Sequence, residues 1–252
     1  MSLPQKASKL LAAVRHRRFR KALRYGVAPA IEHNALLRSL PPLGSIVDVG
    51  ANGGQFSLVA RRLHPSAQII AFEPLPAAVR RYSRVFEGDQ RVVLHRVAVG
   101  KTSEEADFHV SASDDSSSLL PITALQESTF PGTEQRGVER VSVLPLNEVL
   151  DSSQLTPPAL LKIDVQGTEL NVLLGVGELL GLLDYVLVEA SFVELYSGQA
   201  LAHEVIAHLA ERGFVLGGIY NPTTDAEGRS VQADFFFTRR PGLVEDDVHG
   251  VT

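Results

Sequence analysis

The sequence predicts an α/β fold in which helices cover both faces of a doubly wound, mostly parallel sheet. Short apolar runs alternate with amphipathic segments through most of the chain, the pattern of strands joined by crossover helices. The first run, residues 46–49, leads directly into a glycine-rich segment at 50–54. Near the end of the chain, strand-like segments at 214–220 and 234–238 flank the turn-rich residues 221–228. This arrangement predicts a C-terminal antiparallel hairpin.

Composition indicates an ordinary soluble protein. The chain has 252 residues, of which 44% are hydrophobic and 21% charged, which fits one large domain with a substantial core. It has no cysteine, which excludes disulfides, thiolate metal ligands and cysteine nucleophiles. No apolar stretch approaches the ~20 residues of a membrane span, and the N-terminus lacks the pattern of a signal peptide. We therefore expect a cytoplasmic protein.

Positive charge is concentrated at the N-terminus. Residues 1–31 contain eight Lys or Arg and no acidic residue, so the rest of the chain must carry −13 for the total to be −5. This balance excludes a generally basic, nucleic-acid-binding surface. A basic helix is predicted at 5–24, either packed on the domain by its apolar face or acting as an arm for an anionic membrane or a phosphate-bearing substrate. The expected organisation is a basic helical segment at 1–42, a main domain at 43–240 and a tail at 241–252.

The elements expected after the basic helix follow from periodicity and from turn residues. Residues 101–140 are expected to form a long loop or small insertion, with one strand at 104–110, a Ser/Asp-rich stretch at 111–118 and no periodicity through 121–137. The predicted helices lie at 31–40, 56–63, 77–86, 146–150, 169–182 and 201–212. The remaining predicted strands lie at 68–72, 91–99, 141–144, 159–165, 185–189, 215–219 and 233–238.

The glycine cluster at 50–54 is the strongest local signal of a ligand. Glycines allow a sharp turn and close backbone approach, and the following helix N-terminus favours a negative group. A dinucleotide-binding Gly-x-Gly-x-x-Gly pattern fails at Asn52 and Gln55. S-adenosylmethionine has no pyrophosphate, and Asp48 is a suitable partner for its ammonium group, directly or through water. The alternative is a tight strand–helix turn without a ligand.

Glu73 stands at the end of the second predicted strand. A carboxylate there can accept two hydrogen bonds from the vicinal hydroxyls of a ribose. A capping or surface role is the alternative for this residue.

Four motifs in this order resemble the FkbM family of methyltransferases. They are DVGANGGQF at 48–56, FEP at 72–74, VAVG at 97–100 and KIDVQGTE at 162–169. The resemblance covers roughly residues 45–238. It implies a seven-stranded, Rossmann-like methyltransferase sheet, S-adenosyl-L-methionine as cofactor and a hydroxyl acceptor. One departure is Gln166, where the family usually has Glu, which leaves open a catalytically inactive cofactor-binding module.

The resemblance also implies roles for individual cofactor-binding residues. The methionine end of the cofactor is expected beside Asp48, Gly50, Asn52 and Gly54, and the ribose beside Glu73. The serine stretch that includes Ser117 and Ser118 is expected near the adenine, or alternatively is only a solvated loop.

Asp164 is the residue most favoured for chemistry, because it follows a strand expected beside the first strand, at the topological switch point of the sheet. It would act as the base for the acceptor hydroxyl or would orient the cofactor. Glu189, after the next strand, is a second candidate by the same geometry. His203 near a helix start is a third, with a surface or capping role as its alternative. Glu169 in the first turn of a helix fits the helix dipole as well as catalysis.

The sequence therefore predicts a methyltransferase that modifies a hydroxyl of a sugar, glycolipid or secondary metabolite. N-methylation of a small molecule and a nicotinamide dehydrogenase are the enzyme alternatives. Asp164 and Glu189 could together bind a divalent cation, but the sequence has no dense cluster of acidic ligands, so no metal is expected. The acceptor and the oligomeric state do not follow from the sequence.

Overall fold

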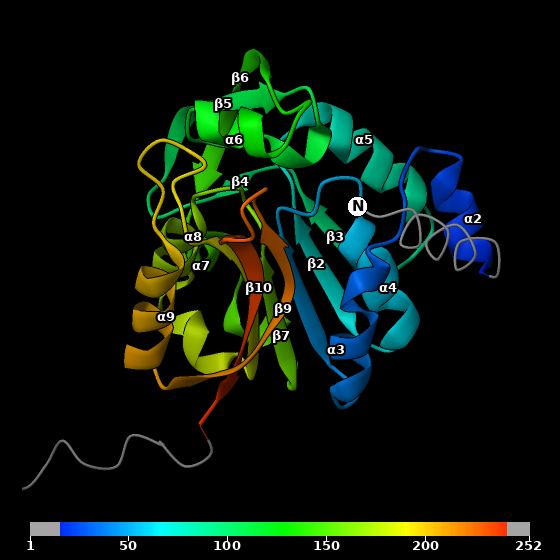
Figure 1. Cartoon of the computed structure of the whole chain (residues 1–252). Coiled ribbons are helices and arrows are strands. Elements are labelled where there is room, and N and C mark those ends of the chain that lie inside the picture. Colours follow the sequence, from blue (N-terminus) through cyan, green and yellow to red (C-terminus); the bar gives the residue numbers. More distant parts are fainter. Residues whose placement is uncertain (1–15, 241–252) are drawn as a thin grey trace, which may run out of the picture.

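The computed structural model describes residues 16–240 and contains a seven-stranded sheet with the order β3-β2-β1-β7-β8-β10-β9 (Figure 1). Adjacent strands from β3 to β8 run parallel, whereas β10 is antiparallel to both β8 and β9. The predicted doubly wound sheet and its C-terminal hairpin are confirmed. The strands are β1 Ser45–Val49, β2 Gln68–Phe72, β3 Val92–His95, β7 Ala159–Ile163, β8 Tyr185–Ser191, β9 Phe214–Thr224 and β10 Ser230–Arg239.

The strand order reverses between β1 and β7. The chain builds outward from β1 through β2 to β3 and then returns to place β7 on the other side of β1. The connections from neighbouring strands therefore leave in opposite directions at the carboxyl ends of β1 and β7, which opens a crevice there. β1 is buried along its whole length, as expected for a central strand with helices on both faces.

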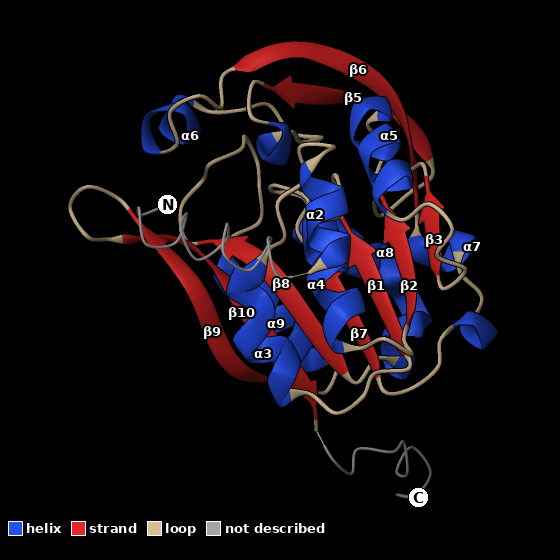
Figure 2. Ribbon diagram, turned by 90° about the vertical axis from the view of Figure 1, so that its right-hand side faces the viewer, coloured by secondary structure: helices blue, strands red, loops and turns tan. Residues whose placement is uncertain are grey.

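Helices on the two faces bury two separate cores, and the sheet lies between them (Figures 1 and 2). On one face lie α2 Arg17–Leu23, α3 Asn34–Ser39, α4 Gln55–Leu63 and α5 Pro76–Val85; on the other lie α7 Leu146–Val149, α8 Glu169–Val176 and α9 Ala202–Glu211. Alternation along the strands divides their apolar residues between the cores, with Ile46 in one and Val47 in the other.

A second, three-stranded sheet lies above the strand ends at the top of Figure 1. It consists of β4 Ala98–Val99, β6 Gln135–Leu144 and β5 Glu104–Ser111, in the order β4-β6-β5. The single strand predicted at 91–99 is therefore wrong, because its two halves belong to different sheets.

Of the two alternatives for residues 101–140, the structure agrees with the small insertion, although residues 121–137 show no periodicity in the sequence. These residues contain α6 Ala124–Thr129 and the beginning of β6. The first six residues of β6 are exposed, so they carry no buried apolar alternation that a sequence pattern could reveal. Antiparallel pairing with β5 makes this segment a strand, although its local sequence does not indicate one.

The N-terminal segment packs on the main sheet. Phe19 and Ala22 of α2 are buried in the core that also contains residues of β1 and β2. The predicted basic helix at 5–24 is described only from residue 16, and the helix predicted at 31–40 begins as a 3₁₀ turn, η1 Ile31–His33. Packing by the apolar face agrees with the first interpretation of this helix, and its membrane contact stays a prediction. Within residues 16–240, no helix is long and apolar enough to cross a lipid bilayer.

Asp89 joins the N-terminal segment to the main domain. Its carboxylate accepts hydrogen bonds from Arg61 of α4 at 2.8 and 3.1 Å and from Arg18 of α2 at 2.5 Å. Burial alone would raise the pKa of Asp89, but these hydrogen bonds outweigh it and hold the pKa at about 2. The ionised carboxylate therefore stabilises the folded state.

We predict that Asp89→Asn lowers the free energy of unfolding at pH 7 by about 1–2 kcal/mol, since solvent screens part of the interaction. The pKa of Asp89 is lowered on folding, so its contribution is complete above the unfolded pKa of ~3.9 and is lost as the pH falls toward 2. Urea unfolding between pH 7 and 2.5 should show the difference shrinking below pH ~4. Asp107→Asn is the matched control, because its ion pair with Arg140 is exposed. An equal effect of both substitutions would contradict the prediction.

Candidate active site

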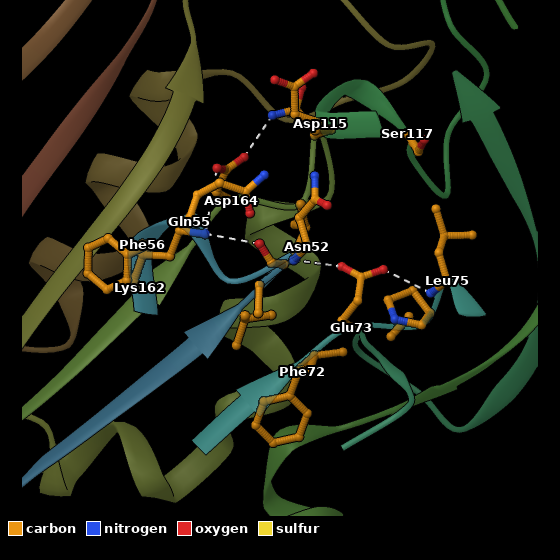
Figure 3. Close-up of a pocket in the computed structure, with 18 of the residues that line it drawn as sticks. Asn52, Gln55, Phe56, Phe72, Glu73, Leu75, Asp115, Ser117, Lys162 and Asp164 are labelled. Carbon is orange, nitrogen blue, oxygen red and sulfur yellow. Dashed lines mark hydrogen bonds and ion pairs between the residues drawn. The ribbon is translucent and has the colours of Figure 1, made fainter. Parts of the chain in front are cut away.

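A pocket of about 340 Å³ lies at the carboxyl ends of β1 and β7 (Figure 3). Its floor is the turn after β1 and the residues that follow β2 and β7. The small sheet covers one side through Phe108 and Ser117, and the N-terminal segment forms another wall through Ala28 and His33. The site therefore combines the main sheet with two segments from outside its strands.

Gly50 shapes the turn that opens the pocket. Its φ is +76°, and a Cβ atom at this position would lie 1.8 Å from the backbone oxygen of Asp164. No side chain fits there, so the loops after β1 and β7 meet in direct backbone contact. Asn52 also has a left-handed φ of +46° and lines the pocket. Gly54 instead caps α4 and packs against Phe86, so it shapes the turn from behind the pocket wall.

Glu73 lines the pocket as a buried carboxylate with only 6% of its surface exposed. One oxygen accepts the Asn52 amide at 2.9 Å and the other accepts the Leu75 amide at 2.8 Å. Burial raises the pKa of Glu73 to about 7, although both amides oppose the rise. Each carboxylate oxygen can accept a second hydrogen bond, so a fixed, paired acceptor faces the pocket.

Lys162 forms an ion-pair network beneath the pocket. Its Nζ lies 3.2 Å from Oδ1 of Asp48 and 3.6 Å from Oδ2 of Asp164, and it donates to the Gly50 carbonyl at 3.1 Å. Burial alone would lower the pKa of Lys162, but the two carboxylates outweigh it and raise the pKa. Asp48 is fully buried and also accepts the Ser57 hydroxyl at 2.6 Å.

Asp48 is therefore not placed where the sequence suggested. It is absent from the pocket lining, and its carboxylate is directed to Lys162 and Ser57. The physical reason is the strand register, in which Asp48 lies directly beside Lys162 on β7. A buried ammonium needs this negative partner, so Asp48 forms an internal ion pair in place of the expected direct contact with a cofactor ammonium. The alternative contact through water stays a prediction.

Gln166 connects the two carboxylates that the sequence favoured for catalysis. Its Nε2 donates to Asp164 Oδ1 at 2.7 Å and to Glu189 Oε2 at 2.8 Å. Its Oε1 accepts the hydroxyl of Tyr196 at 2.8 Å, and its backbone oxygen accepts the hydroxyl of Ser118 at 2.5 Å. A neutral amide thus holds two acidic groups that would otherwise repel each other.

Glu189 is brought to the site through this amide. It does not line the pocket, and its second oxygen accepts Gln232 Nε2 at 3.0 Å. Burial raises the pKa of Glu189 well above its usual range, and the nearby carboxylates of Asp164 and Asp234 raise it further. Glu189 therefore lies behind Asp164, which faces the pocket with 37% of its side chain exposed.

The other predicted residues divide between the pocket and its surroundings. Ser117 lines the pocket, whereas Ser118 is buried and fixes Gln166. His203 is exposed on α9 and is not among the residues that line the pocket. Within the described part of the chain, no group of three or more His, Asp or Glu side chains could hold a metal ion.

Several residues of the site had no role assigned from the sequence. His33, Gln55, Phe56 and Lys162 line the pocket, and Tyr196 reaches Gln166. Lys162 carried a usable signal, since a lysine inside an apolar strand two residues before Asp164 lies on the same face as that aspartate. His33 carried none, because its segment reaches the crevice only through tertiary packing.

Comparison with known proteins identifies the family. The sequence profile described as methyltransferase FkbM domain matches residues 48–216. The chain belongs to this family. The match includes the glycine turn, Glu73, Asp164 and Gln166, so the resemblance read from the four motifs is confirmed and the chain is a methyltransferase.

Three named relatives are methyltransferases, each from a different organism. The 2-O-methyltransferase NoeI of Sinorhizobium fredii is 29% identical, with 73% of this chain and 79% of NoeI covered. The 31-O-demethyl-FK506 methyltransferase FkbM of Streptomyces tacrolimicus is 29% identical over 76% of this chain and 79% of its own length. The hexuronic acid methyltransferase AglP of Haloferax volcanii is 26% identical over 68% of each chain.

We predict that Gln166→Glu lowers the free energy of unfolding by about 1–3 kcal/mol at pH 8, because three carboxylates would meet where an amide now donates twice. The new carboxyl would have a raised pKa in the folded state. It would be protonated at pH 5, and the cost would grow as the pH rises through that pKa. Urea unfolding at pH 5 and 8 measures the difference. The exposed Gln90→Glu is the matched control for the charge change, and a cost independent of pH would contradict the explanation.

Proposed function

We propose that this protein transfers a methyl group from S-adenosyl-L-methionine to a hydroxyl group of a sugar, glycolipid or secondary metabolite. Membership of the family indicates methyl transfer, and the position of the Glu73 carboxylate supports S-adenosyl-L-methionine as the cofactor. Its two oxygens are fixed by the Asn52 and Leu75 amides and present acceptors into a pocket beside a glycine turn. The vicinal hydroxyls of a ribose are the donors that this arrangement fits.

The residues around Glu73 fit the rest of such a cofactor. The backbone at Gly50 and Asn52 lines the pocket with no room for a Cβ at Gly50, which suits the methionine end. Ser117 and Phe108 line the side beneath the small sheet and suit the adenine. The bound cofactor would supply a methyl group on a positively charged sulfur.

Asp164 is proposed to balance the positive charge of the cofactor. Its backbone oxygen lies against the Gly50 turn, and its carboxylate accepts the Gln166 amide and is 3.6 Å from the Lys162 ammonium. These donors already engage Asp164, which supports the cofactor-orienting role over the role of base. Holding the reactants in line can contribute about 7–11 kcal/mol to such a transfer.

The acceptor class follows from the relatives. NoeI and FkbM are named as methyltransferases that act at an oxygen, and AglP as one that acts on a hexuronic acid. We therefore propose a hydroxyl-bearing small molecule as partner. The alternatives of N-methylation and of an inactive cofactor-binding module become outcomes of the test.

We predict that calorimetric titration will show micromolar binding of S-adenosylmethionine and S-adenosylhomocysteine and no binding of NAD. Glu73→Gln should weaken both sulfur nucleosides about 10- to 100-fold, since a hydrogen bond to a charged group contributes about 1.5–3 kcal/mol. The exposed Glu87→Gln is the control. Binding of NAD without binding of the sulfur nucleosides would overturn the proposal.

The same protein should then transfer labelled methyl groups to a panel of methyl glycosides that includes methyl glucoside and methyl glucuronide. Glucosamine is the amine comparison. Methylation at nitrogen alone would favour the N-methyltransferase. Tight cofactor binding without transfer to any acceptor would favour the inactive module.

For Asp164→Asn, we predict about tenfold weaker binding of S-adenosylmethionine and a smaller change for S-adenosylhomocysteine, which lacks the positive charge on sulfur. Parallel calorimetric titrations of the two ligands give the comparison. Unchanged affinity for both, with turnover lost, would instead assign Asp164 the role of base.

A further inference from the structure

His33 is the histidine of the pocket, although no sequence motif contains it. It closes the 3₁₀ turn η1 and lines the pocket from the N-terminal wall. Its side chain is only 13% exposed. Its ring packs edge-on against the ring of Phe56, with 5.2 Å between the ring centres and an interplanar angle of 77°. Phe56 also lines the pocket, so the imidazole is held at a defined place in its wall.

Asp234 lies beside Nδ1 of the imidazole. Its Oδ2 is 3.7 Å from Nδ1 of His33 and accepts the Asn221 amide at 2.7 Å. Its carboxylate is 12% exposed, and Asp234 is not among the pocket-lining residues. Nδ1 is buried and makes no hydrogen bond in the described structure. Asp234 is therefore the acceptor nearest to a proton on Nδ1 among the charged groups described.

This arrangement determines which ring nitrogen is free. When Nδ1 carries the proton toward Asp234, Nε2 is left as an unprotonated acceptor. Of the two ring nitrogens, Nδ1 is among the buried unpaired side-chain atoms of residues 16–240, and Nε2 is not. A base oriented by a carboxylate behind it is a common catalytic arrangement.

We propose that His33 is the base for the acceptor hydroxyl and that Asp234 is its positioning residue, an inference that rests on the proposed function. The hydroxyl proton passes to Nε2 of His33 as the acceptor oxygen forms a bond to the methyl carbon. The carbon–sulfur bond breaks, and its electron pair stays on sulfur, which becomes neutral. The imidazolium then returns its proton to water.

The acidic side chains of the site already accept hydrogen bonds from other groups of the protein. Asp164 and Glu189 share the Gln166 amide, and Glu73 holds two backbone amides. His33 differs because it meets the pocket and has a buried carboxylate beside it.

The charges around the dyad come from four elements. Glu32 belongs to η1, Lys162 to β7, and Glu189 lies opposite Asp234 across the β8–β10 pair. Burial raises the pKa of Asp234, and Asp164 after β7 raises it further, while His33 and Lys162 lower it. The carboxylate beside His33 is therefore influenced by charges from β7 and from the loop that follows it.

Nitrogen-15 NMR of histidine-labelled full-length protein tests the dyad without an acceptor. His33 is assigned by its loss in His33→Gln. Its neutral form should carry the proton on Nδ1 in the wild type, and Asp234→Asn should shift the tautomer toward Nε2–H, because the charged acceptor beside Nδ1 is lost. A neutral form protonated on Nε2 in the wild type, or an unchanged tautomer in Asp234→Asn, would overturn the proposal whatever the acceptor is.

Kinetics with the methyl glycoside panel tests the proton transfer. His33→Ala should lower kcat about 10²- to 10⁴-fold, leave the calorimetric Kd for S-adenosylmethionine within about threefold, and recover activity when imidazole is added. His109→Gln is the control, since its ring bonds Gln135 at the surface outside the pocket. A full rate in His33→Ala, or a loss that imidazole does not restore, would contradict the role of base. Failure of the wild type to bind S-adenosylmethionine would instead reject the proposed function.

Discussion

The site depends on one buried ammonium. Lys162 lies between Asp48 and Asp164, bonds the Gly50 carbonyl and sits 5.7 Å from the centre of the Phe56 ring. It therefore ties β1 to β7 where the sheet opens and fixes the loops that follow both strands. Removing one partner of such a buried pair typically costs 3–5 kcal/mol. The backbone contact at Gly50 and the orientation of Asp164 both follow from this interaction.

A row of acids follows the same edge of the sheet from β7 to β10. Asp164, Glu189 and Asp234 come from neighbouring strands or the loop after one, and the negative charge of each is next to a cation or a hydrogen-bond donor. Lys162 forms an ion pair with Asp164, and the Gln166 amide donates to both Asp164 and Glu189. His33 lies beside Asp234. All three compensating groups line the pocket.

The sequence predicted the central sheet well because its strands are apolar and end in short polar motifs. Glu73 and Asp164 could be located by their positions after strands, since parallel strands bring their carboxyl ends together. Asp48 could not be assigned correctly, because its partner depends on the register between β1 and β7. His33 was hidden for a related reason: its distance from Asp234 is 201 residues along the chain but 3.7 Å in space.

The two halves of the pocket differ in their relation to the family. The matched region, residues 48–216, contains the glycine turn and Glu73 but neither His33 nor Asp234. His33 thus reaches the pocket from a flank outside the matched region, and so does Asp234 beside it, which does not line the pocket. A substitution on this flank can therefore change the shape of the pocket without touching the glycine turn or the Glu73 carboxylate that the matched region supplies.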